Sequence, residues 1–175
     1  GEQGFSLIEL VVVIAVLAVL TAIALPNFLG VSEDASVRTA QQAALNAFKE
    51  CKVKWAQNKR DAFNIASAVQ FSIPAVTDWK IIARNSTGVP DWAGAIAQAG
   101  GGKGQPTAST EVGCFDGSNA SRDIYAVPDN RAAFPVFIII ADGTKQCRTG
   151  TNLNFDTFNT GCNSASASTP VTSWN

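Results

Sequence analysis

The chain of 175 residues contains no histidine and no methionine, and only 15% of its residues are charged. Histidine is the commonest general base and the commonest metal ligand, so its absence argues against most acid–base and metal-dependent enzymes. The formal net charge is −1, so bulk electrostatics give no reason to expect nucleic-acid binding. No set of nucleophile, base and acid is apparent, and we expect neither an enzyme nor a cofactor or metal.

Three stretches could in principle bind ligands, but for each the sequence favours a simpler structural interpretation. Residues 100–104 are glycine-rich but lack the spaced G-K-[ST] of a phosphate loop, which favours a surface turn. Residues 116–119 with Asp123 lack the terminal glutamate and the ligand spacing of a calcium loop. A basic cluster near Trp55 could contact nucleic acid, but cations are also favoured at a helix C-terminus, and we prefer that reading. The cluster comprises Lys49, Lys52, Lys54, Lys59 and Arg60.

The first 30 residues hold a long apolar run. From residue 10 to residue 25 only Thr21 is polar, and Phe5, Leu7 and Ile8 precede the run. A helix of about 20 such residues is about 30 Å long, which matches the hydrocarbon core of a bilayer. The sequence therefore predicts a helix that can span a membrane.

Glu9 is an ionisable residue near one end of this apolar run. An unpaired carboxylate is costly in hydrocarbon, so we expect Glu9 to have a cationic partner. The alternative is an ordinary signal anchor, in which Glu9 reaches the membrane interface.

The string GFSLIEL at residues 4–10, followed by the apolar run and Pro26, resembles the start of a type IV pilin. The resemblance is close over residues 4–30 and loose up to residue 60. It implies that a prepilin peptidase cuts between Gly4 and Phe5 and methylates the new amine of Phe5. Residues 1–4 would then be residual leader or an extra N-terminus. Many pilins carry glycine where this chain has Ala18, which leaves open how readily the helix loosens before Pro26.

The resemblance also implies an assembly role for Phe5, Glu9 and Pro26. The freed amine of Phe5 lies at the same end of the helix as Glu9, so the amine of one subunit can meet the Glu9 carboxylate of the next. A misaligned copy would leave both charges unpaired, so Glu9 would act as a register check, while apolar packing supplies the affinity. Contacts that repeat without closing build a filament.

The function expected from the resemblance is that of a structural subunit of a type IV pilus, used for adhesion, twitching motility or DNA uptake. Its partners would be other copies of the chain, the prepilin peptidase and the pilus assembly machinery. The subunit would lie in the inner membrane before assembly and in an extracellular pilus afterwards. A pseudopilin of a type II secretion system is the first alternative. A membrane-tethered extracytoplasmic binding domain or enzyme is the second.

The expected fold is α+β, with a long N-terminal helix packed on a small C-terminal antiparallel sheet. We expect an apolar helix half at residues 5–30 and an amphipathic half at 31–60, with a connection at 61–110 and the sheet at 111–175. Pro26 should kink or locally unwind the helix, which restarts near residues 32–34. An apolar stripe should face the sheet. It contains Val37, Ala40, Ala44, Ala47 or Phe48, Cys51 and Trp55.

Short elements are expected after residue 60. Strands are predicted at 79–82, 111–115 and 124–127, and a short helix at 90–99. Residues 137–141 and 144–148, joined by Asp142 and Gly143, predict a β-hairpin.

The four cysteines, Cys51, Cys114, Cys147 and Cys162, predict two disulfides in an oxidising compartment. Three pairings are possible, and the absence of C-x-x-C spacing argues against zinc. Closing the loop between Cys147 and Cys162 would contribute about 3 kcal/mol. Pilins often close a C-terminal loop in this way, so the resemblance favours Cys147–Cys162. This choice leaves Cys51–Cys114, which would tie the helix to the sheet.

Overall fold

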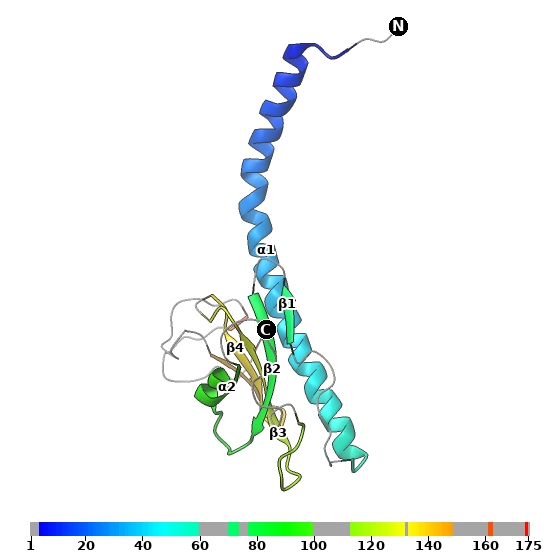
Figure 1. Ribbon diagram of the computed structural model, residues 1–175, viewed down its shortest axis with the longest axis vertical. Helices are drawn as coiled ribbons and strands as arrows, with labels where there is room; N and C mark the ends of the chain where they lie inside the picture. The colour runs from blue at the N-terminus through cyan, green and yellow to red at the C-terminus, as the bar shows by residue number, and fades with distance from the viewer. Residues whose placement is uncertain are drawn as a thin grey trace.

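The computed structural model describes residues 4–59, 70–73, 77–99, 113–131, 133–148, 161, 162 and 174. One long helix, α1 (Leu7–Ala56), projects from a head that contains a sheet and a short helix (Figure 1). The first half of α1 extends away from the head, and the second half lies along the sheet. This arrangement confirms the α+β class with a long N-terminal helix.

The head contains one antiparallel sheet with the strand order β1-β2-β3-β4-β5. Its elements are β1 (Gln70–Ile73), β2 (Thr77–Asn85), α2 (Trp92–Ala99), β3 (Arg122–Pro128), β4 (Val136–Ile139) and β5 (Lys145–Arg148). The predicted strands at 79–82 and 124–127, the short helix and the hairpin are therefore confirmed. The sheet also extends into the region 61–110, which the sequence analysis assigns to a connection. The strand predicted at 111–115 is wrong within residues 113–115, where Phe115 forms an isolated bridge with Ser121.

The hairpin between β4 and β5 shows why the Asp-Gly signal works. The Gly143 amide donates to the Ile140 carbonyl at 2.8 Å, and the Ile140 amide donates to the Thr144 carbonyl at 2.8 Å. Gly143 has a φ of 98°, which a residue without a Cβ adopts without steric cost. The Asp142 carboxylate accepts from the Thr144 amide at 2.7 Å and closes the turn.

Helices cover both faces of the central strands. Alternate residues of β3 belong to different clusters, with Ile124 and Ala126 in the cluster that contains α1 residues, and Tyr125 and Val127 in the cluster that contains α2 residues. The short helix at 90–99 is predicted from the sequence, but its packing on the face of the sheet opposite α1 is not. The continuous apolar run in β4 is the pattern that strands buried on both faces show.

Small residues let α1 approach the sheet closely. Val37, Ala40, Ala44 and Ala47 are at most 1% exposed, and Cys51 continues the same stripe. Trp55, which the sequence analysis places in this stripe, is 46% exposed. That placement is wrong because the last turns of α1 diverge from the sheet (Figure 1).

The helix is continuous through Pro26. The predicted unwound segment is absent, and residues 32–34 lie inside a helix rather than at the start of a new one. A proline removes only one backbone donor, and here the turns on both sides continue the helix. The carboxylates of Glu33 and Asp34 therefore do not cap a helix N-terminus.

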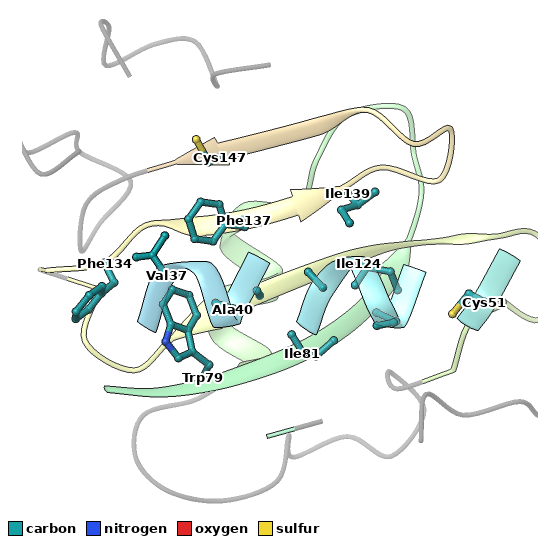
Figure 2. Close-up of a cluster of buried hydrophobic side chains, with 14 of the residues drawn as sticks. Val37, Ala40, Cys51, Trp79, Ile81, Ile124, Phe134, Phe137, Ile139 and Cys147 are labelled. Carbon is teal, nitrogen blue, oxygen red and sulfur yellow. The ribbon is translucent and has the colours of Figure 1, made fainter. Parts of the chain in front are cut away.

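Trp79 joins the sheet to α1 in the centre of the core. Its indole Nε1 donates to Ser36 Oγ of α1 at 2.9 Å. Its ring stacks on Phe137 and meets the edge of Phe134, both at centroid distances of 6.0 Å. Figure 2 shows these three rings beside Val37 and Ala40. The buried indole thus satisfies its one donor while filling the space that the small α1 residues leave open.

Two disulfides link the head, Cys51–Cys114 and Cys147–Cys162. These are the two pairs that the sequence analysis favours. The first joins α1 to the segment before β3, and the second joins β5 to Cys162. Beside it, Gly161 has a φ of 75°, and a Cβ there would lie 2.5 Å from a methyl carbon of Val37. Only glycine therefore lets this segment approach α1.

Trp174 packs onto the last strand of the sheet. Its indole Nε1 donates to the Gln146 carbonyl at 2.7 Å. Its ring lies 5.2 Å from the ring of Phe137, and Lys145 Nζ lies 5.5 Å from its centroid. These contacts cover part of β5, which is an edge strand and would otherwise present unpaired backbone groups.

Replacing Trp174 with alanine is expected to lower the free energy of unfolding by about 2 kcal/mol, because the change removes a half-buried indole and its hydrogen bond. Chemical unfolding of the detergent-solubilised chain, followed by circular dichroism, measures this change. Trp174→Phe is the matched control, since it keeps the ring contact with Phe137 and loses only the hydrogen bond. Equal stability of the alanine variant and the unmodified chain would contradict the assignment.

Asp123 is a buried carboxylate on β3, 1% exposed. It accepts a hydrogen bond from the Ala141 amide at 2.8 Å and another from the Ser86 side chain. Burial, with a smaller effect from Asp142, raises the pKa of Asp123 above its ordinary value of 3.8. The folded state therefore holds this proton more tightly than the unfolded state does. The protonated carboxyl of Asp123 contributes fully to the stability of the folded state below pH 3.8. This contribution is lost as pH rises through the raised pKa.

Asp123→Asn is expected to remove this pH dependence while keeping an oxygen that accepts from Ala141. The free energy of unfolding of the asparagine variant, relative to the unmodified chain, should rise with pH from about 3.8 upward. Urea unfolding at a series of pH values measures this difference. A difference between the two proteins that stays constant with pH would show that Asp123 is not shifted.

Candidate assembly site

From Leu7 to Leu25, α1 extends beyond the described part of the head, and every residue is exposed. Its apolar side chains, with that of Phe5 just before it, are largely exposed, from 92% for Phe5 to 49% for Val11. They are Phe5, Leu7, Ile8, Leu10, Val11, Val12, Val13, Ile14, Val16, Leu17, Val19, Leu20, Ile23 and Leu25. Among the described residues, α1 is the one helix long and apolar enough to cross a membrane. Such a surface must be covered by lipid or by another protein.

Thr21 is the one polar side chain within this run, and it is satisfied inside its own helix. Its hydroxyl donates to the carbonyls of Leu17 and Ala18 at 2.9 and 3.0 Å. Thr21 therefore needs no hydrogen-bond partner from another molecule. Glu9 is the polar side chain that distinguishes one end of the exposed half.

Residues 4–6 precede the helix, and all three are exposed. A Cβ built on Gly4 would meet no atom within 4 Å. The bond between Gly4 and Phe5 therefore lies in uncovered, non-helical backbone, which a peptidase can reach. Nothing in the described part of the chain shields it.

Glu9 lies in the first turn of α1 and forms a capping box with Ser6. The Ser6 amide donates to Glu9 Oε2 at 2.7 Å, and the Glu9 amide donates to Ser6 Oγ at 3.3 Å. Phe5, Ile8, Glu9, Val12 and Val13 line a shallow surface hollow that is apolar apart from the carboxylate. The carboxylate is thus held close to Phe5, at the tip of the exposed helix.

Comparison with known families shows which proteins have a similar N-terminus. Residues 1–25 match the prokaryotic N-terminal methylation motif. The chain therefore begins with a type IV prepilin-like N-terminus. Neither the curated proteins nor the solved structures contain a match to the chain. The motif is shared by type IV pilins and pseudopilins, and it points to a structural subunit rather than an enzyme. It implies processing by a prepilin peptidase and assembly into pili, and with the apolar helix it is consistent with membrane anchoring before assembly.

The role of Ser6 in this prepilin-like N-terminus was not predicted from the sequence. Glu9 was expected to be a carboxylate without a local partner, whereas the structure gives it the Ser6 amide. The signal was present, because Ser6 and Glu9 have the S-x-x-E spacing of a capping box. The capping box gives Glu9 a hydrogen bond but no opposite charge, so the carboxylate still lacks a cationic partner among the described residues.

The remaining candidate residues lie elsewhere in the chain. Pro26 is 17 residues from Glu9 on a continuous helix, about 25 Å along the axis, so the two do not form one site. The four disulfide cysteines lie in the head and at its contact with α1. The candidate site is therefore confined to Phe5, Ser6 and Glu9, with Gly4 as the position before the cut.

Proposed function

We propose that this chain is a structural subunit of a type IV pilus, which polymerises through the N-terminal half of α1 into an extracellular filament. The observation that supports this proposal most directly is that the apolar side chains up to Leu25 are exposed, while Phe5 and Glu9 line one surface hollow at the tip of the helix. Lipid covers the helix before assembly, and the same helix of other copies covers it afterwards. The resulting fibre serves adhesion, twitching motility or DNA uptake.

Cleavage by the peptidase would create the positive charge that pairs with Glu9. Cleavage between Gly4 and Phe5 frees an amine that the peptidase then methylates, and this amine remains positively charged. The peptide nitrogen of Phe5 is four residues before Glu9, just ahead of the first turn of α1. The amine of one subunit therefore approaches Glu9 of a neighbour when two parallel helices are displaced by about one turn. Because the surroundings are apolar, a copy in another register leaves two charges without partners.

The head is suited to exposure outside the cell. Disulfides persist in oxidising compartments, and the two disulfides here hold the head to α1 and to its own last strand. Among the described residues, the buried clusters of the head contain no α1 residue before Val37, so the apolar half is available for assembly without unfolding the head.

Mass spectrometry and electron microscopy of the natural host's surface fibres test this function. The expected subunit has the mass of a methylated chain that begins at Phe5, with two disulfides, and it is the main component of long fibres. Short fibres confined to the periplasm would instead assign the chain to a pseudopilin. An uncut chain found only as a single membrane-bound copy would overturn the proposal and indicate a tether.

A further inference from the structure

The part of α1 that lies on the head has a second side, which the head does not cover. We call it the outer face and define it by exposed residues of α1 that point away from the buried stripe. They are Val31, Asp34, Ala35, Arg38, Thr39, Gln42, Asn46, Lys49 and Val53. The two valines at its ends are 68% and 54% exposed. The outer face continues the exposed apolar half of α1, which is the surface proposed to contact other copies.

Charge is distributed unevenly along this face. Asp34, next to Glu33, lies at the end where α1 reaches the head, and Lys49 lies toward the other end. Arg38 lies one turn after Asp34, but its guanidinium donates to Gln41 Oε1 at 3.2 Å and forms no ion pair with Asp34 among the described residues. The two residues are 15 positions apart, which is about 22 Å along the axis and about four turns, so they are on the same side of the helix. Within the described ranges, neither Asp34 nor Lys49 has an ion-pair partner.

The helix dipole does not explain why Glu33 and Asp34 occur at this place in α1. Because α1 begins at Leu7, Glu33 and Asp34 lie in its interior, far from the first turn where the helix dipole favours acids. Nor can Asp34 interact strongly with Lys49 of its own chain, because 22 Å exceeds the screening length of about 8 Å at physiological salt. Opposite charges at a fixed spacing on an uncovered helix face can be satisfied by a parallel copy of the same helix.

We propose that the outer face is a second contact between subunits, in which Asp34 of one copy pairs with Lys49 of a parallel copy displaced by about 22 Å. Glu33 adds negative charge beside the pair, and Val31 and Val53 add apolar area to the contact. This inference rests on the proposed pilus, because it requires parallel copies. It concerns another neighbour than the Phe5–Glu9 contact does, since that contact needs a displacement of only about one turn.

Zero-length cross-linking of sheared fibres tests the pairing directly. A carbodiimide joins a carboxylate to an amine only where the two touch, and within one chain Asp34 and Lys49 are too far apart. The expected result is a cross-linked peptide pair that joins residue 33 or 34 to Lys49 between two subunits. Cross-links from Glu33 and Asp34 exclusively to other lysines, or none in fibres that cross-link elsewhere, would overturn the assignment.

Charge reversal gives an independent test. Asp34→Lys and Lys49→Glu are each expected to reduce the yield of sedimentable fibre about tenfold, because every contact would then oppose two like charges. The double variant restores the opposite signs and should recover the yield to within about twofold. Asp142→Lys, a reversal at an exposed turn residue outside the outer face, is the control and should leave the yield unchanged.

The outcomes separate this inference from the proposed function. Normal fibres from both single reversals would overturn the Asp34–Lys49 contact and leave the pilus proposal intact. Failure of the double variant to recover, with both single variants defective and all heads folded by circular dichroism, would also overturn the pairing. Absence of any fibre from the unmodified chain in its host would overturn the pilus proposal, and this contact with it.

Discussion

Glu9→Gln is expected to leave the chain folded and in the membrane but to abolish ordered fibres. Glutamine keeps an oxygen for the Ser6 amide, so the capping box survives while the negative charge is lost. The amine of a neighbouring Phe5 then has no carboxylate to meet in an apolar environment, and the correct register loses its advantage over others. Electron microscopy of surface fibres and immunoblotting of the membrane fraction measure the two effects.

Ser6→Ala provides the matched control for Glu9→Gln. It removes the hydroxyl that accepts from the Glu9 amide and weakens the helix start by about 1 kcal/mol, but it keeps the carboxylate. We expect this variant to assemble. Abundant normal fibres from Glu9→Gln would remove the register argument. Loss of fibres from Ser6→Ala alone would show that the capping geometry, and not the charge, controls assembly.

Removing the Cys51–Cys114 disulfide is expected to have the largest effect on the stability of the head. The bond spans a sequence separation of 63 residues, against 15 for Cys147–Cys162. Loop closure therefore predicts a loss of about 4 kcal/mol for the double change Cys51→Ser and Cys114→Ser, against about 3 kcal/mol for the other pair. The first pair also holds α1 to the segment before β3, so its loss weakens the contact between the helix and the head.

Thermal unfolding of the detergent-solubilised chain measures both changes. For a chain of this size, 4 kcal/mol corresponds to a fall in Tm of about 10 °C. Reduction of the unmodified chain, followed by alkylation, is the control that breaks both bonds without substitution. A smaller loss from the 63-residue loop than from the 15-residue loop would contradict the entropic argument.

Local patterns predicted much of this fold. The Asp-Gly turn between two apolar runs predicted the β4–β5 hairpin, because its only requirement is a glycine at positive φ. The apolar spacing predicted the buried face of α1 as far as Cys51. The layer formed by α2 was not predicted, although the run Val136–Ile139 carries the signal of a strand buried on both faces. A pattern of burial shows that a face is covered but does not show by which segment.

The candidate site was predicted in part. The sequence alone placed Phe5 and Glu9 at one end of an apolar helix, because residues four apart on a helix are neighbours wherever that helix lies. It also contained the S-x-x-E spacing that the capping box uses, although this was overlooked. Of the kink or unwinding predicted at Pro26, the unwinding was wrong, and so was the new helix start proposed for residues 32–34.

The sequence by itself therefore determined an apolar helix with an acid at its tip, the methylation motif, the amphipathic stripe and the local turns, since each depends on residues close in the chain. Only the tertiary structure decided that α1 continues unbroken from Leu7 to Ala56, that both faces of the sheet are covered, and that one side of α1 remains open. These features depend on which surfaces meet across long separations in sequence. The free energy of that packing is shared among side chains that no local pattern brings together.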